Sequence, residues 1–401
     1  MDLWKKFKTS PLNLNLALDL LRQADQEVEK MEPIRILLAG KTGSGKSTLV
    51  NALFRENIAS TGVGLPVTQK VQKITKKGLP LVIYDTKGLE LHSKSQDESI
   101  QHLLHLVKDA KKGDAVEPIH LVYYCINATM ARIEPQEITL IAMLAQELPV
   151  IVVLTQAIGE DIKGFKDSVK KAVPQVKVVI PVLAKDFELA GGQKIKAYGL
   201  EELTKHSYEF VPEEVEKAFI NAQRVDLALK IAQSRSWANK YMKTTFGIGL
   251  TPLPIADSAL LVPIQITMLA HITSIFGLSI DKKQIVSMMA GVGGTGLASM
   301  VGKYLASSAA KWVPGVGSVT GGMVNGFTAS TVTLALAYSY IEILKQITLA
   351  ENQGKQLLPK EITALMRKTF GQELETISHR FPDKVKDSLP EWMTNSLDQY
   401  E

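Results

Sequence analysis

A glycine-rich stretch early in the chain has the residue types of a phosphate-binding loop. It follows the apolar run 34–39 and reads Gly40-Lys41-Thr42-Gly43-Ser44-Gly45-Lys46-Ser47-Thr48. The spacing Gly-x4-Gly-Lys-Ser between a strand and a helix is typical of a P-loop. Its glycines let successive N–H groups turn toward a phosphate, and the helix N-terminus adds a positive dipole end. Lys46 is expected to reach the outer phosphates, and the Ser47 hydroxyl to ligate Mg2+.

A second candidate for phosphate and metal binding follows the apolar run 81–84. Asp85 ends that run, and Gly88 comes three residues later. An aspartate at a strand end can hold Mg2+ through water, and the N–H of Gly88 can meet a terminal phosphate. The sequence therefore predicts that Asp85 and Gly88 lie beside the P-loop.

A loop bounded by glycine and proline, residues 60–68, separates these two motifs. A threonine in such a loop can close over Mg2+ when the terminal phosphate is present and release it afterwards. Thr68 is preferred to Thr61 because it stands close before the next strand. A nucleotide-controlled switch requires three parts in this order: a phosphate-binding loop, a threonine that can move, and an Asp-x-x-Gly motif.

These motifs must be positioned by the alternating strands and helices predicted from residue 34 to about 210. Short apolar runs separated by amphipathic helices favour an α/β fold with a doubly wound, mainly parallel sheet, whose ligands bind at the carboxyl ends of the strands. The expected strands are 34–39, 71–75, 81–85, 120–126, 150–155 and 176–183. The expected helices are 46–55, 97–110, 135–146 and 162–173.

The motifs resemble those of translation-factor-class small GTPases of the Era-like group. The run from Gly40 to Leu53 carries most of the likeness, which extends over residues 34 to about 205. The phrase from Thr61 to Thr68 also resembles the switch I loop of immunity-related GTPases. The resemblance implies that the chain binds GTP and GDP, uses Mg2+ and hydrolyses GTP, with Lys46, Thr68 and Gly88 as catalytic residues. It also implies that Ser47, Thr68 and Asp85 hold the metal.

The base-specifying motif of such GTPases, Asn/Thr-Lys-x-Asp, is altered in this chain. After the apolar run 150–154 the sequence reads Thr155-Gln156-Ala157-Ile158. Thr155 fits the motif, whereas Gln156 replaces its lysine and Ile158 its aspartate. Glu160 or Asp161 could reach the base if the loop is longer. The last base-contact loop is expected at 181–185, with the N–H of Ala184 near the guanine oxygen and Lys185 next to it.

Hydrolysis is expected to be slow. Leu89 stands where Ras-like proteins carry a glutamine that orients the attacking water, and a leucine side chain makes no hydrogen bonds. Help is then expected from another residue, a dimer partner or an activator. Arg132 could act as an internal arginine finger, although a structural or interface role is the commoner use of such an arginine. Gly43 replaces the asparagine of potassium-activated relatives, so potassium activation is not expected.

Composition indicates a globular chain of about two domains. Of 401 residues, 45% are hydrophobic and 22% charged, and the net charge of +5 is too diffuse to indicate DNA binding. The lone cysteine, Cys125, cannot form an internal disulfide, which fits a reducing compartment. We therefore expect a cytoplasmic protein, with peripheral attachment to the inner face of a membrane left open.

Three segments are predicted: an N-terminal helical segment at 1–33, a GTPase domain at 34–208 and a helical domain at 209–401. Within them, helices are expected at 11–30 and 212–241, and Asp257 is expected to cap a further helix. The segment 258–280 has no formal charge and is long enough to span a bilayer. Its polar residues Thr267, His271 and Ser274 share one helical face, which suits a packed bundle better. Membrane association and a soluble bundle both stay open.

Three functions remain open from the sequence. The first is a switch in which the bound nucleotide controls the helical domain. The second is a membrane-associating or self-assembling GTPase, in which nucleotide controls a homodimer or oligomer formed through the G domain. The third is a ribosome-assembly GTPase. The region after Pro252-Leu253-Pro254 resembles the uncharacterised helical domain that follows the G domain in some bacterial Era-like GTPases, relatives of which occur in inner-membrane proteins.

Overall fold

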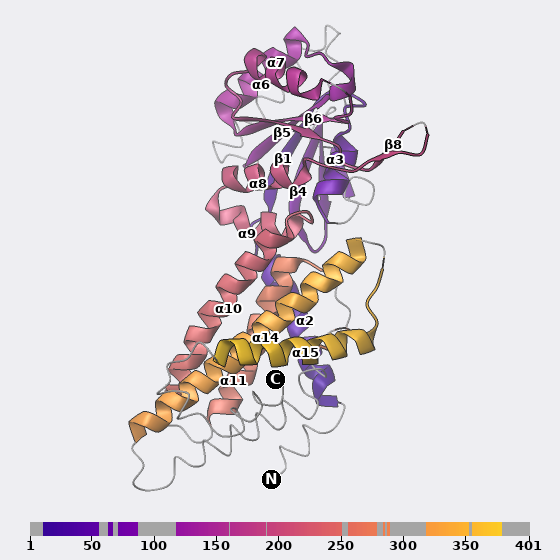
Figure 1. Ribbon diagram of the computed structural model, residues 1–401. Helices are drawn as coiled ribbons and strands as arrows, with labels where there is room; N and C mark the ends of the chain where they lie inside the picture. Colours follow the sequence, from indigo (N-terminus) through magenta and orange to yellow (C-terminus); the bar gives the residue numbers. More distant parts are fainter. Residues whose placement is uncertain are drawn as a thin grey trace. The chain divides into compact units, whose positions relative to one another are not determined.

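The computed structural model describes residues 11–55, 63–66, 71–86, 118–159, 161–189, 191–250, 256–278, 284, 287–288, 318–352 and 355–378 (Figure 1). Two compact units make up the chain. One is Val28–Leu227, and the other combines Met1–Glu27 with Ala228–Glu401. The first unit contains the segment 34–208, and the predicted domain boundaries stay predictions. The N-terminal helix groups with the C-terminal half of the chain.

A seven-stranded sheet forms the centre of the α/β unit, in the order β2-β3-β4-β1-β5-β6-β7. Strands β4, β1, β5, β6 and β7 are parallel, whereas β2 and β3 run antiparallel to their neighbours. This confirms the predicted mainly parallel, doubly wound sheet. The strands are β1 Ile34–Ala39, β2 Val63–Pro66, β3 Val71–Lys76, β4 Leu79–Thr86, β5 Leu121–Asn127, β6 Val150–Thr155 and β7 Val178–Val182.

Helices cover both faces of the sheet because alternate strand residues are apolar on both sides. Leu37, Tyr84 and Val122 point into one core, which lies under α6 and α7 (Figure 1). Their neighbours along the strands point into a second core with α3, α8 and α9. The helices are α3 Lys46–Leu53, α6 Pro135–Glu147, α7 Ile162–Ala172, α8 Leu200–Phe210 and α9 Glu213–Ala222. The helix predicted at 97–110 lies outside the described residues.

Two predicted segments differ in the structure. Residues 63–66 were expected within a loop, but they form the edge strand β2, which pairs with Gln72–Thr75 of β3. An edge position tolerates the proline at the end of this strand. The helix predicted at 212–241 is interrupted between α9 and α10. Gln223 there is fully buried and exchanges two side-chain hydrogen bonds with the backbone of Asp226, at 2.8 and 2.9 Å, which replace the helical pattern.

The other unit is helical. Its described helices are α2 Pro11–Glu29, which crosses the boundary between the two units, α10 Leu227–Leu250, α11 Ala256–Phe276, α14 Ser318–Asn352 and α15 Pro359–Ser378. Helix α14 packs on α11 and α15. Asp257 was expected to precede its helix as a cap, but α11 begins one residue before it. The short β8 Phe187–Glu188 and β9 Lys194–Ile195 form a hairpin in the α/β unit.

Polar side chains in the helical unit find partners within the bundle. Thr273 on α11 and Tyr340 on α14 share a buried hydrogen bond of 2.7 Å, and Gln265 donates to Thr333 at 3.1 Å. Lys230 is 2% exposed, and its ammonium donates to the last carbonyls of α11, those of Ile275 and Phe276. Across the part of the chain that the structure describes, no helix has the length and apolar character needed for a membrane crossing.

Candidate nucleotide-binding site

The P-loop connects the carboxyl end of β1 to the first turn of α3, as the sequence predicts. Gly40, Gly43 and Gly45 all have positive φ, at +133°, +77° and +78°. A Cβ atom at Gly40 would lie 2.3 Å from the carbonyl oxygen of Cys125, so only glycine fits there. Gly45 forms the N-cap of α3 in the left-handed conformation, which leaves the first N–H groups of the helix directed at the loop.

Lys46 folds back into the loop that precedes it. Its ammonium donates to the carbonyl oxygens of Gly40 at 2.8 Å and Lys41 at 2.9 Å, and the residue is 8% exposed. Burial lowers the pKa of Lys46, and the negative charge of Asp85 opposes that change. The cation therefore lies against the backbone of the P-loop, where it can reach a bound phosphate.

Asp85 lies near the carboxyl end of β4 beside the P-loop. It pairs in register with Leu38 of β1, and the hydroxyl of Thr86 donates to the carbonyl of Leu38 at 3.1 Å. The neighbouring ends of two parallel strands thus bring the carboxylate to the edge where α3 begins, with Ser47 in the first turn of that helix. A hydroxyl and a carboxylate are the hard oxygen ligands that Mg2+ prefers, so these residues fit the expected metal. Thr68, Gly88 and Leu89 lie outside the described residues.

The predicted base loop is attached directly to the P-loop. The hydroxyl of Thr155, at the end of β6, donates to the carbonyl of Ser44 at 2.6 Å and of Ile126 at 3.1 Å. Gln156 follows with a φ of +49°, and its side-chain amide donates to the carbonyl of Gly43 at 3.5 Å. The structure therefore places these two side chains against the phosphate loop. A base-contact role for Thr155 and Gln156 stays a prediction.

A tyrosine that no sequence motif indicates connects the two predicted base loops. The hydroxyl of Tyr198 donates to the carbonyl of Ala157 at 2.7 Å, and its backbone exchanges two 3.0 Å hydrogen bonds with Leu183. The N–H of Ala157 donates in turn to the carbonyl of Val182. Ala184 and Lys185 follow directly after this connection. No motif surrounds Tyr198, so its position could be found only from the fold.

Two other predicted nucleotide-binding residues have additional partners. The side chain of Asp161 caps α7, where its Oδ1 accepts from the N–H of Gly164 at 2.9 Å. The ammonium of Lys41 lies 2.5 Å from Glu134 and 3.4 Å from Glu137, both on the first turn of α6 or just before it. Glu134 and Glu137 form a capping box there. Lys41 thereby ties the P-loop to α6, a connection that the sequence analysis did not identify.

Other predicted P-loop residues and Arg132 lie at the surface of this edge. Thr42, Gly43, Ser47 and Thr48 are exposed, so their backbone and hydroxyl groups are open to a ligand. Arg132 is 67% exposed and lies 3.9 Å from a carboxylate oxygen of Glu134. Its proposed use as an arginine finger stays untested.

Comparisons with known proteins match the same part of the chain. Residues 35–156 match the family model described as "50S ribosome-binding GTPase". The tRNA modification GTPase MnmE of Bordetella petrii is 33% identical over 128 residues, which are 30% of this chain and 27% of that protein. GTPase Der of a Ruegeria species is 25% identical over 154 residues, 36% of this chain and 30% of that protein. The chain thus spans under a third of the length of these relatives.

Solved structures of GTP-binding proteins are also similar to parts of this chain. A probable GTP-binding protein engB is 20% identical, with a TM-score of 0.33, and the match covers 44% of this chain and 97% of that one. The cytosolic domain of the T. maritima FeoB iron transporter in a GDP form is 17% identical, with a TM-score of 0.28 over 79% of this chain and 98% of that one.

The family match coincides with the P-loop, with Asp85 and with the start of the loop at Thr155. It stops before the helical unit, so the type of that unit and the finer likeness to Era-like or immunity-related GTPases stay predictions. Together with the parallel sheet and the geometry around Lys46, the match identifies the region from residue 35 to residue 156 as part of a P-loop GTPase domain.

Proposed function

We propose that the chain binds GTP at the P-loop and hydrolyses it to GDP and phosphate with Mg2+. The single observation that carries the proposal is the placement of Lys46. Its ammonium donates to two carbonyls of the glycine loop, those of Gly40 and Lys41, near Asp85 and in a region that matches a GTPase family. A nucleotide's terminal phosphates would exchange those carbonyl contacts for stronger charge-assisted ones.

The residues of the chain supply binding and positioning. The N–H groups at the start of α3 and the glycine loop would hold the phosphates, and Lys46 would neutralise charge that develops on the terminal phosphate as water attacks in line. Ser47 and Asp85 would hold Mg2+, directly and through water respectively, and the ion supplies further charge neutralisation when bound. Thr68 and Gly88 are proposed to complete the site beside the terminal phosphate.

Base recognition is proposed to rest on the two loops that Tyr198 connects. With Ile158 in the position of the usual aspartate, contacts to guanine must come from other groups. The N–H of Ala184 and the side chains of Lys185, Gln156 and Asp161 are the candidates. Asp161 is also the N-cap of α7, so any contact to the base would share this carboxylate with the helix.

Hydrolysis is proposed to be slow and to control the helical unit. The sequence supports slow hydrolysis through Leu89, whose side chain cannot orient water. A second candidate, binding to a ribosome, is favoured by the description of the matched family. Sedimentation of the chain with ribosomes in GDP and in a non-hydrolysable GTP analogue would separate the two, because a switch for the helical unit alone predicts no co-sedimentation.

Phosphate release tests the hydrolysis proposal. Wild-type chain should release phosphate from GTP in the presence of Mg2+, and chelation of the metal should abolish release. Asp85→Asn keeps the shape but removes the charge, and it should lower the rate by at least about tenfold, or 1.4 kcal/mol. Equal rates for wild type, Asp85→Asn and Lys46→Ala would contradict catalysis at this site.

A further inference from the structure

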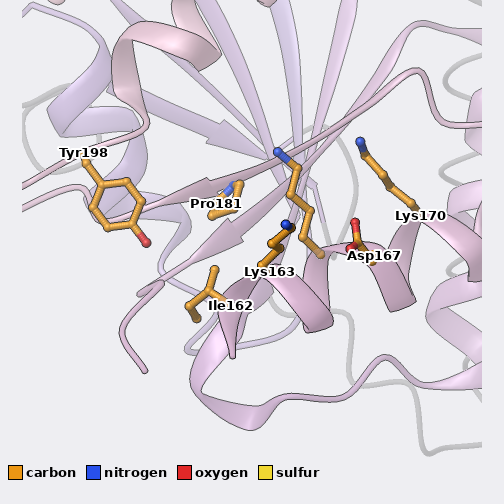
Figure 2. A pocket seen from close by; sticks show the side chains of 7 residues that line it. Ile162, Lys163, Asp167, Lys170, Pro181 and Tyr198 are labelled. Carbon is orange, nitrogen blue, oxygen red and sulfur yellow. The ribbon is translucent and has the colours of Figure 1, made fainter. Parts of the chain in front are cut away.

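An open hollow on the α/β unit contains a concentration of positive charge outside the P-loop. It has a volume of about 540 Å³ and is lined by Ile162, Lys163, Lys166, Asp167, Lys170, Pro181 and Tyr198 (Figure 2). This volume is within the range of small-molecule sites, about 300–1,000 Å³. None of the lining residues belongs to the P-loop, whereas Tyr198 and Pro181 place the hollow next to the predicted base loops.

Three lysines line the hollow from one side of α7. Lys163, Lys166 and Lys170 recur at helical spacing, and the side chains of Lys163 and Lys170 extend from the same side of the helix (Figure 2). Seven residues of helix span about 10 Å, so the ammonium groups can contact more than one phosphate. Asp167 and the carboxylate of Glu202, 3.8 Å from Lys166, offset only part of this charge.

The opposite wall is apolar and fixed. Pro181 belongs to β7, and Tyr198 is 41% exposed. The hydroxyl of Tyr198 is held by Ala157, and its backbone is paired with Leu183. Gly199 follows with a φ of +82°, and a Cβ there would lie 2.1 Å from the carbonyl of Pro181. This close packing sets the ring beside the lysines before any ligand arrives.

We propose that this hollow is a second ligand site, which binds a small molecule with a diphosphate or triphosphate group. The lysine ammonium groups would contact the phosphates, because compact cations pair well with phosphate oxygens. The Tyr198 ring and Pro181 would contact an apolar or aromatic part of the ligand. A concave site with an apolar wall fits such a ligand better than the flat surface of a lipid bilayer.

Calorimetric titration with inorganic pyrophosphate tests the proposal. The parent protein is the full chain with Lys46→Ala, which removes the P-loop lysine and thus separates this site from the nucleotide site. At low ionic strength the parent should bind pyrophosphate. Adding Lys163→Glu with Lys170→Glu should weaken binding by at least about tenfold. The matched pair Lys205→Glu with Lys243→Glu changes the same charge at exposed lysines elsewhere and should bind like the parent.

Two further measurements keep the test valid if the glutamate pair fails to fold. One uses the neutral pair Lys163→Gln with Lys170→Gln, and the other is lysine footprinting of the unmutated chain. Pyrophosphate should protect Lys163, Lys166 and Lys170 from acetylation and leave Lys205 unprotected. The proposal is overturned by absent binding in the parent, by equal binding in both glutamate pairs, or by uniform protection. It is also overturned if vesicles of phosphatidylglycerol bind through these lysines while pyrophosphate does not.

Discussion

The hydroxyl of Thr155 donates a 2.6 Å hydrogen bond to the carbonyl of Ser44, 111 residues earlier in the chain. Both residues are buried, at 4% and 3% exposure. The bond joins the end of β6 to the middle of the P-loop. The side chain of Thr155 therefore connects the start of the predicted base loop directly to the backbone of the P-loop.

Thr155→Val should remove the hydrogen bond between Thr155 and Ser44 and destabilise the protein. The substitution keeps the shape of the side chain but leaves the buried carbonyl of Ser44 without its donor, which costs about 1–3 kcal/mol. Urea unfolding should show that loss, and nucleotide affinity should fall with it. Thr139→Val is the control, at an exposed threonine of α6 whose hydroxyl donates to the carbonyl of Pro135 in the same helix. Equal stability of the two variants would show that the hydrogen bond between Thr155 and Ser44 does not stabilise the protein.

Tyr198→Phe should weaken nucleotide binding without emptying the space that the ring fills. The hydroxyl fixes Ala157 between the two base loops, and a neutral hydrogen bond contributes about 0.5–1.5 kcal/mol, or roughly two- to tenfold in affinity. Titration with GDP measures the change. Tyr208→Phe removes a hydroxyl bonded to Glu216 in the same unit and should leave GDP affinity unchanged. A larger loss in Tyr208→Phe than in Tyr198→Phe would argue against a positioning role for Tyr198.

Lys46 should make stability depend on pH in the alkaline range. Burial lowers its pKa in the folded protein, so between that pKa and the ordinary 10.5 the unfolded chain binds more protons. Stability then rises with pH across this window. Urea unfolding of wild type and Lys46→Met at several pH values isolates the effect. The other titrating groups are common to both proteins, so their contributions cancel in the difference between the two free energies of unfolding. The free energy of unfolding of wild type should rise relative to Lys46→Met as the pH rises, and an opposite slope would contradict the buried cation.

Lys230→Met should destabilise the helical unit specifically. The buried ammonium satisfies the last carbonyls of α11, and hydrogen bonds to a charged group contribute about 1.5–3 kcal/mol. Hydrogen exchange in α11 should accelerate, while GDP binding in the other unit stays unchanged. Lys243→Met, at an exposed lysine of the same helix α10, is the control. Unchanged exchange in Lys230→Met would mean that the capping contact adds no stability.

The sequence predicts most of the sheet because strand periodicity and apolar runs are local signals. The P-loop and Asp85 are found for the same reason, since their spacing follows from backbone requirements within a few residues. The predictions that were wrong concern segments whose structure depends on tertiary contacts. Residues 63–66 become a strand only because β3 offers them a partner edge. The break after Ala222 depends on Gln223, which is buried against the end of α3 through the bridge to Phe54.

The site is less predictable than the sheet, for a physical reason. Lys41 and Tyr198 work through partners far away in the chain, Glu134 and Ala157, and no spacing within the sequence encodes such pairs. Conversely, Asp161 carries a local signal as a helix cap, and its predicted contact with the base competes with that signal. Thr68 and Gly88 lie outside the described residues and stay predictions from motif spacing alone.

Calorimetric titration of wild type and Lys46→Ala with GDP, GTP and ATP tests the central claim most directly. Wild type should bind GDP and GTP at about micromolar dissociation constants, near −8 kcal/mol, with ATP at least about tenfold weaker. Lys46→Ala should lose measurable binding of all three while its melting curve shows that it is still folded. Equal affinity for ATP and GTP would contradict a guanine-specific site, and unchanged GTP affinity in Lys46→Ala would contradict binding at the P-loop.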